Sequence, residues 1–216
     1  MNWFVTAITT GIAAFAATNI DDIVVLMLFF AQVNATFRRW HIVAGQYLGF
    51  TAIIFASLPG FFGGLIVPRT WIGLLGLVPI VIGISYLLKK TTNSVQEVAE
   101  HFARSPSNSS VFSKIAGILS PQIYSVAAVT IANGGDNIGI YVPLFASSDI
   151  ASLLVILSVF FMLVGVWCYV GYQLTRYRIV AKVITRYSDA LIPFVFIGLG
   201  IFILIESGTV ALLPFL

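Results

Sequence analysis

The chain has very little charge. Only 9% of its 216 residues are Asp, Glu, Lys or Arg, whereas 59% are hydrophobic. So few charged side chains cannot cover a soluble domain of this length, which excludes a water-soluble globule and makes the lipid bilayer the expected surroundings. A single cysteine, Cys168, excludes an intramolecular disulfide. The sequence has no phosphate-binding loop, which argues against an ATP-driven pump, and no nucleic-acid partner is expected.

Long apolar segments are abundant instead. A membrane-spanning helix needs roughly 20 mostly apolar residues. The sequence supplies six such segments, at residues 3–32, 41–66, 70–88, 119–146, 150–174 and 190–214. We therefore predict an all-α integral membrane protein with six transmembrane helices. The first segment has no Lys or Arg ahead of it and no small-residue cleavage pattern, so we interpret it as a retained span and not as a signal peptide.

The basic residues predict the topology. Ten of the 11 Lys and Arg residues lie in the loops after the first, third and fifth segments, and only Arg69 lies on the opposite side. Loops rich in Lys and Arg stay in the cytoplasm. Both termini are therefore predicted to lie outside.

The sequence also contains an internal repeat. A linker rich in Ser and Asn, residues 91–115, separates residues 1–90 from residues 116–216, and each part holds three predicted spans. DDIVVLMLFFA from Asp21 aligns without a gap on DNIGIYVPLFA from Asp136, and LVPIVIGI resembles LIPFVFIGL at nearly the same offset. Because three is odd, the two three-helix repeats should be inverted relative to each other. Transporters built in this way place their site near the bilayer midplane, at interrupted helices.

Aspartates stand in two of the apolar segments, in TNIDDIVVL and in NGGDN. A charge at the bilayer centre costs at least ~2.5–3.5 kcal/mol. No Lys or Arg lies in any predicted span, so the compensating partner should be a cation, a proton or water. Adjacent helical side chains point about 100° apart, so Asp21 and Asp22 cannot both face one ion unless the helix is interrupted. Gly134 and Gly135, and the Thr-Asn pair before Asp21, favour breaks in helices 1 and 4.

Oxygen-rich side chains around two breaks predict a site for a divalent cation. The candidate ligands are the carboxylates of Asp21, Asp22 and Asp136 and the neutral oxygens of Thr18, Asn19, Asn133 and Asn137. Protons would neutralise the carboxylates after the metal leaves, which predicts proton-coupled antiport. The alternative interpretation is that these residues only cap helices at a structural kink.

Five segments carry a family resemblance: ATNIDDIVVLMLFFAQ, GQYLGF, LGLVPIVIGI, ANGGDNIGIYVPLF and FIGLGIFILIESG. Together they resemble the CadD-type cadmium resistance transporters, a family within the lysine exporter superfamily, along all six predicted spans. The resemblance implies a non-enzymatic protein of the bacterial plasma membrane that exports Cd²⁺ and other divalent ions, with the ion as substrate and no cofactor. The family's polar motifs fall on Asn19, Asp21, Asp22, Gln46, Asn133, Asp136, Asn137 and Glu206.

Further residues have two interpretations each. Gln46 and Tyr47 either line the ion's path or bond neighbouring helices together, and Glu206 is either a proton acceptor at the exit or an interfacial side chain. Cadmium is soft and favours thiolate, yet the lone Cys168 is interpreted as packing. Small-residue pairs such as Gly45 and Gly49 predict close helix packing, within one chain or in a homo-oligomer.

Two other functions compete with metal export. An exporter of an organic cation, such as a basic amino acid, follows by analogy with the superfamily. An intramembrane aspartic protease also uses two buried aspartates. The protease signature needs Gly at position 133, where this chain has Asn, and no Pro-Ala-Leu segment is present.

Overall fold

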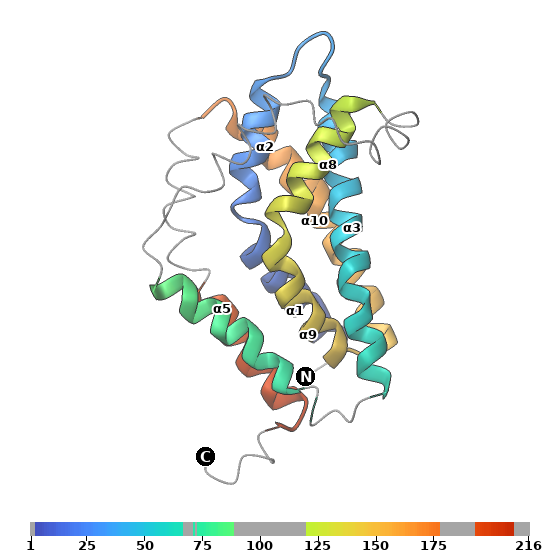
Figure 1. Ribbon diagram of the computed structural model, residues 1–216, viewed down its shortest axis with the longest axis vertical. Helices are drawn as coiled ribbons and strands as arrows, with labels where there is room; N and C mark the ends of the chain where they lie inside the picture. The colour runs from blue at the N-terminus through green and yellow to red at the C-terminus, as the bar shows by residue number, and fades with distance from the viewer. Residues whose placement is uncertain (1–2, 67–70, 72, 89–119, 178–192, 210–216) are drawn as a thin grey trace.

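The computed structural model describes residues 3–66, 71, 73–88, 120–177 and 193–209, except for the side chains of Tyr86 and Asp136. These residues form helices and no strand, which confirms the all-α prediction. The helices are α1 (Trp3–Asn19), α2 (Asp22–Ala31), α3 (Arg39–Ile66), the short 3₁₀ helix η1 (Gly73–Gly76), α5 (Leu77–Leu88), α8 (Pro121–Asn133), α9 (Gly135–Ser147), α10 (Ile150–Leu174) and a C-terminal helix over Pro193–Glu206 (Figure 1). The predicted linker, residues 91–115, lies outside the described residues.

Two helices are long and apolar enough to cross a membrane, namely α3 and α10. The pair formed by α1 and α2 counts as a third span if it is taken as one bent element. The apolar stretches Leu74–Ser85, Asn137–Ser147 and Pro193–Glu206 lie in helices shorter than a full span. Among the described residues the model therefore gives two or three candidate spans, and the six-span arrangement stays a prediction.

Both predicted helix breaks are present. The predicted span 3–32 divides into α1 and α2, which are bent by 60° relative to each other. The predicted span 119–146 divides into α8 and α9, with Gly134 between them. At the first break the Asp21 carboxylate accepts a hydrogen bond from the backbone N–H of Asp22 at 3.1 Å, which caps the start of α2.

The breaks are covered by long helices from the other part of the chain. Helix α3 packs along α8 and α9, and helix α10 packs along α1 and α2. Glycines let α3 approach closely: a Cβ atom at Gly45 would lie 2.7 Å from the Ile123 carbonyl oxygen, and one at Gly60 would lie 2.5 Å from that of Val142. The small-residue pairs of α3 thus serve contacts within the chain.

Helix α5, which directly follows η1, and the C-terminal helix Pro193–Glu206 lie side by side in Figure 1, in green and red. Their contact is antiparallel, because Gly76 faces Gly200 whereas Gly83 faces Pro193. A Cβ atom at Gly76 would lie 2.6 Å from the Gly200 carbonyl oxygen. Glycine is therefore required for this close packing as well.

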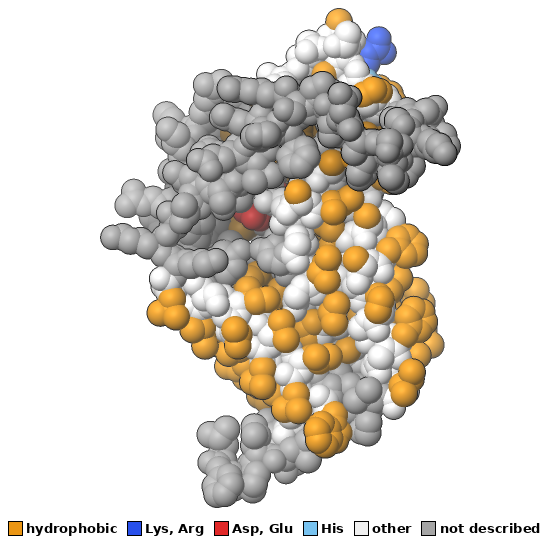
Figure 2. Space-filling model, in the orientation of Figure 1, with side chains coloured by type: hydrophobic (Ala, Val, Ile, Leu, Met, Phe, Trp, Pro, Cys, Tyr) orange, Lys and Arg blue, Asp and Glu red, His pale blue; other side chains and the backbone are white. Residues whose placement is uncertain are grey.

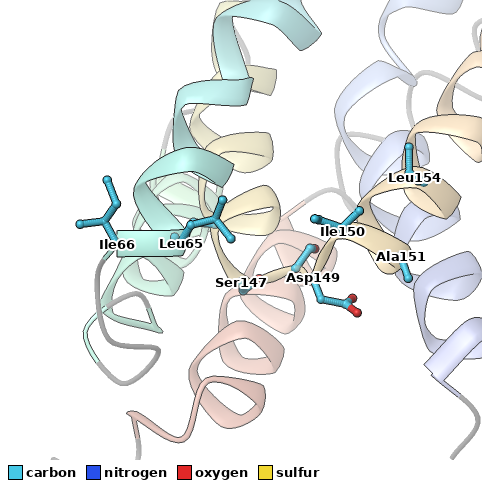
Figure 3. Close-up of a pocket in the computed structure, with 10 residues that line it drawn as sticks. Leu65, Ile66, Ser147, Asp149, Ile150, Ala151 and Leu154 are labelled. Atoms are coloured by element: carbon cyan, nitrogen blue, oxygen red, sulfur yellow. The ribbon is translucent and has the colours of Figure 1, made fainter.

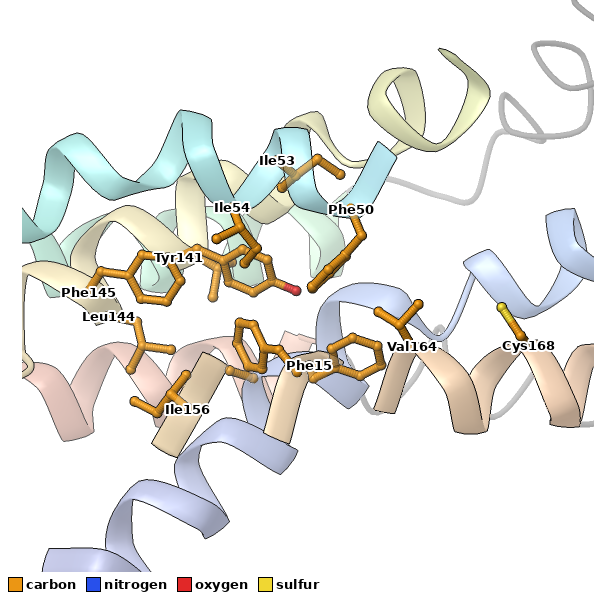
Figure 4. Packing of buried hydrophobic residues seen from close by; sticks show 14 of the residues in the cluster. Phe15, Phe50, Ile53, Ile54, Tyr141, Leu144, Phe145, Ile156, Val164 and Cys168 are labelled. Atoms are coloured by element: carbon orange, nitrogen blue, oxygen red, sulfur yellow. The ribbon is translucent and has the colours of Figure 1, made fainter. Parts of the chain in front are cut away.

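Aromatic rings fill the centre of the bundle, where α1, α3, α9 and α10 meet (Figure 4). The Phe160 ring lies 5.7 Å from Phe15, 6.0 Å from Phe50 and 4.8 Å from Tyr141, between ring centroids. The outer surface is also apolar: hydrophobic side chains cover much of the face in Figure 2, and residues such as Phe55 and Met162 are well exposed. Apolar side chains on both the inside and the outside fit a protein surrounded by lipid.

Two basic residues of the predicted cytoplasmic loops meet at one end of the bundle. The guanidinium of Arg39, at the start of α3, lies 4.4 Å from the centre of the Tyr172 ring. The guanidinium of Arg176, just after α10, lies 5.9 Å from the centre of the same ring. Both contacts are in the range of cation–π interactions. The end of the loop after the first predicted span and the start of the loop after the fifth therefore lie on the same side of the molecule.

Candidate cation site

The polar residues of the apolar segments gather at the two helix breaks. Asn19 ends α1 and Asp22 begins α2, while Asn133 ends α8 and Asn137 lies in the first turn of α9. A helix start directs backbone N–H groups and the positive end of the helix dipole toward nearby anions. The fold thus places both carboxylate-bearing motifs at helix starts.

One group of side chains surrounds a carboxylate, and we call Asp22, Gln46, Thr130 and Asn133 the carboxylate cluster. Asp22 is only 5% exposed. Its Oδ1 atom accepts a hydrogen bond from Asn133 Nδ2, and its Oδ2 atom accepts one from Gln46 Nε2 at 3.3 Å. The Thr130 hydroxyl lies 2.7 Å from Gln46 Oε1. Hydrogen bonds to a charged group are worth about 1.5–3 kcal/mol each, so these amides offset part of the cost of burying the carboxylate.

A second group is neutral, and we call Thr18, Asn19 and Tyr141 the hydroxyl cluster. The Tyr141 hydroxyl lies 2.7 Å from Thr18 Oγ1 and accepts from Asn19 Nδ2 at 2.8 Å. Asn19 Nδ2 also donates to the Phe15 carbonyl at 2.9 Å. Asn137 Nδ2 lies 3.4 Å from Asn19 Oδ1. This cluster joins the end of α1 to the start of α9.

The structure places the seven predicted ligands in different surroundings. Asn133 contacts Asp22 in the carboxylate cluster, whereas Thr18, Asn19 and Asn137 are bonded to one another and to Tyr141 in the hydroxyl cluster. Asp21 is half-buried and caps α2. The side chain of Asp136 lies outside the described residues, although its backbone belongs to α9.

Of the three residues predicted to line the ion's path, only Gln46 is hydrogen-bonded to a residue of these clusters in the described structure. Gln46 belongs to the carboxylate cluster. Tyr47 instead donates from its hydroxyl to the Phe161 carbonyl at 3.0 Å, which bonds α3 to α10. Glu206 is exposed at the end of the C-terminal helix.

Sequence reasoning missed three participants: Thr130, Tyr141 and Trp167. The indole of Trp167 on α10 donates to the Asn19 carbonyl at 2.7 Å, at the end of α1. A signal for the first two was present. Thr130 precedes Asn133 by one helical turn and Tyr141 follows Asn137 by one turn, so each shares a helix face with a predicted ligand.

Within the described part of the chain, no group of three or more His, Cys, Asp and Glu side chains is arranged to hold a metal. A cation at the carboxylate cluster would therefore draw on amide, hydroxyl and backbone oxygens as well, which are ligands of hard cations. Cys168 is buried, and Figure 4 shows it at one end of the hydrophobic cluster.

A separate surface hollow of about 920 Å³ lies where α3, α9 and α10 begin or end (Figure 3). Its described lining includes none of the predicted ligands. Asp149 is the one charged side chain of that lining, and its carboxylate accepts from the Ser152 N–H at 3.1 Å to cap α10. The Asp149 carboxylate therefore has a structural role as a helix cap.

Comparisons with known proteins agree with a membrane transporter. The model of the Cad family, described as cadmium resistance transporter, matches residues 15–215. Comparison with curated proteins and with solved structures gives no match. A transporter family fits a chain that is not an enzyme. Since the match covers nearly the whole sequence and both helix breaks, the chain belongs to the cadmium resistance transporter family.

Proposed function

We propose that the protein exports divalent cations, foremost Cd²⁺, across the bacterial plasma membrane through a site at the two helix breaks. The observation that carries this proposal is the Asp22 carboxylate, buried at a helix start between amides of α3 and α8. A buried carboxylate is costly in hydrocarbon, and a bound cation would offset that cost. A surface carboxylate would not do so with comparable strength.

The proposed ligand set combines charge with neutral oxygens. Asp22 supplies the central carboxylate, and Asp21 and Asp136 supply further charge from the two breaks. Two or three carboxylates match or exceed the charge of a divalent ion. The neutral oxygens come from Thr18, Asn19, Asn133 and Asn137. Because oxygen ligands do not favour cadmium strongly over calcium or manganese, we expect these ions to compete.

We also propose the finer architecture of two inverted three-helix repeats. The reciprocal packing supports it, since α3 covers the break between α8 and α9 while α10 covers the break between α1 and α2. The meeting of Arg39 and Arg176 on one tyrosine supports a common cytoplasmic side for their loops, with both termini outside.

Protons complete the proposed cycle. Metal binding to carboxylates competes with protons, so an inward proton flow would drive export by antiport. Tyr47 and Glu206 are proposed to serve the path between the site and the two surfaces.

The test is transport by purified protein in proteoliposomes that contain a cadmium-sensitive dye. We expect cadmium flux that follows an imposed pH gradient, stops with an uncoupler, and is lost in the Asp22→Asn variant. Flux that ignores both gradient and uncoupler would contradict antiport. Transport of lysine without transport of cadmium would replace the proposal by export of a basic amino acid.

A further inference from the structure

Thr130 has no part in the proposed ligand set, yet it contacts that set through Gln46. Close packing of α3 on α8 produces this contact: a Cβ atom at Gly49 would lie 2.8 Å from the Ala127 carbonyl oxygen and 2.6 Å from Thr130 Cβ. Gln46, one turn earlier on α3, therefore reaches both Thr130 and Asp22. Thr130 and Gln46 are buried, at 3% and 5% exposure.

The Thr130 hydroxyl has two acceptors within reach and only one proton. Its Oγ1 atom lies 3.0 Å from the Val126 carbonyl oxygen, one turn back on α8, and 2.7 Å from Gln46 Oε1. A hydroxyl donates one hydrogen bond and accepts two. When Thr130 donates to Gln46, the amide is oriented with its nitrogen toward Asp22 Oδ2, at 3.3 Å.

The same atoms accommodate the reversed amide. If Thr130 donates to the Val126 carbonyl, its oxygen is available to accept from Gln46 Nε2. The Gln46 Oε1 atom then faces Asp22. Two oxygens facing each other repel, unless a cation lies between them. In both arrangements the Thr130 hydroxyl proton has an acceptor and bonds Thr130 to the neighbouring atom of the Gln46 amide or of its own helix.

A hydroxyl is required for this reversal, because it alone serves as donor in one arrangement and as acceptor in the other. Two other hydroxyls of α3, one buried and one half-buried, behave differently. Ser57 on α3 donates to the Ile53 carbonyl of its own helix at 2.9 Å, and Thr51 donates to that of Tyr47 at 2.6 Å. For neither residue does the structure give a second side-chain acceptor of the kind that Thr130 has in Gln46.

We propose that Thr130 is a positioning residue that lets the Gln46 amide reverse, so that Nε2 faces the Asp22 carboxylate in one arrangement and Oε1 faces a divalent cation in the other. This inference rests on the proposed function, because it assigns a role in cation binding at the same site. Gln46 is then a ligand only in the cation-bound arrangement, and Thr130 makes both arrangements low in energy.

The test combines cadmium titration with infrared difference spectroscopy on the full chain, with glutamine side chains ¹³C-labelled. The Gln46→Met variant identifies the Gln46 carbonyl band by its loss. In the wild type we expect cadmium to shift this band to lower frequency, as coordination weakens the carbonyl bond. Thr130→Val should abolish or reduce the shift and lower cadmium affinity about three- to tenfold, the equivalent of one hydrogen bond.

Matched variants separate positioning from general damage. Thr130→Ser keeps a hydroxyl and should restore both the band shift and the affinity. Thr51→Val removes a hydroxyl from the same helix as Gln46 and should leave both unchanged. A wild type that binds cadmium with an unmoved Gln46 band overturns the inference while the proposed function stands, as does a Thr130→Val variant equal to wild type in both measurements. A wild type that binds no cadmium overturns the proposed function and this inference together.

Discussion

The two polar clusters at the helix breaks differ in charge and in how firmly their bonds are fixed. The hydroxyl cluster is neutral, and Asn19 is held at several atoms by α1, α9 and α10. The carboxylate cluster holds the buried Asp22 carboxylate with the amide of Gln46, for which we have proposed a second orientation. Both clusters join the two breaks, but the hydroxyl cluster supplies rigidity whereas the carboxylate cluster supplies charge. On the proposed function, the carboxylate cluster is the part of the site that rearranges when an ion binds, and the hydroxyl cluster is the part that stays in place.

Removing the charge should have the largest effect. We expect Asp22→Asn to weaken cadmium binding by about 4 kcal/mol, close to a thousandfold, because the neutral donors around it cannot replace a carboxylate. Isothermal titration and efflux from proteoliposomes measure this loss. Asp149→Asn, at the cap of α10, is the control and should keep wild-type affinity. Equal affinity of Asp22→Asn and wild type would place the cation elsewhere.

Separating α3 from α8 should have the next largest effect. A Cβ atom at Gly49 would press on the Ala127 carbonyl and on Thr130. We expect Gly49→Ala to lower the free energy of unfolding by about 3 kcal/mol, at the upper end for overpacking. Thermal unfolding in detergent measures it.

The matched control lies on the same helix. At Gly63 an added Cβ meets nothing within 4 Å. Gly63→Ala should therefore leave stability unchanged or raise it by up to about 1 kcal/mol through helix propensity. If the two variants melt alike, the close packing of α3 on α8 is not what stabilises the carboxylate cluster.

The Tyr141→Phe variant tests the hydroxyl cluster. Loss of the hydroxyl removes its hydrogen bonds with Thr18 and Asn19 and leaves buried polar atoms without that partner, so we expect a loss of about 2 kcal/mol in stability. Cadmium affinity should change little, because the charge lies in the other cluster. Tyr177→Phe, at an exposed tyrosine, is the control and should melt like wild type. A large loss of affinity with unchanged stability would make the hydroxyl cluster, and not Asp22, the main determinant of cadmium binding.

Cys168→Ala should have the smallest effect. Cys168 is buried in the hydrophobic cluster, so truncation should cost about 1 kcal/mol of stability through lost packing. Cadmium affinity should stay at the wild-type value if the ligands are oxygens. ¹¹³Cd NMR is the check, since its chemical shift distinguishes sulfur from oxygen ligands. A shift typical of thiolate that disappears in this variant would make Cys168 a ligand.

The positions of the breaks could be predicted from sequence because they depend on local chemistry. Gly134 and the capping carboxylate of Asp21 favour a helix end through their own local chemistry. The contact between Asp22 and Asn133 joins the two breaks, but it does not join matched positions, because the repeat alignment pairs Asp22 with Asn137.

The partners of these residues could not be predicted in the same way. Thr130 and Tyr141 join the clusters because specific faces of α8 and α9 turn inward, and that orientation depends on which helix packs against them. The unequal burial of Asp21 and Asp22 has a simple geometric cause, because neighbouring side chains near a helix start point in different directions. The helices that contact the α3 glycines could likewise be identified only from the tertiary structure, since the same glycine spacing serves contacts within and between chains.

Helices α3 and α10 each pack against the interrupted helix of the other part of the chain, which bears on how the protein is assembled. Each of these helices shields the interrupted helix of the opposite part, so a lone amino-terminal or carboxy-terminal fragment would leave open backbone and amides facing hydrocarbon. During synthesis α1 and α2 therefore lack their packing partner until α10 is made, last but one among the described helices.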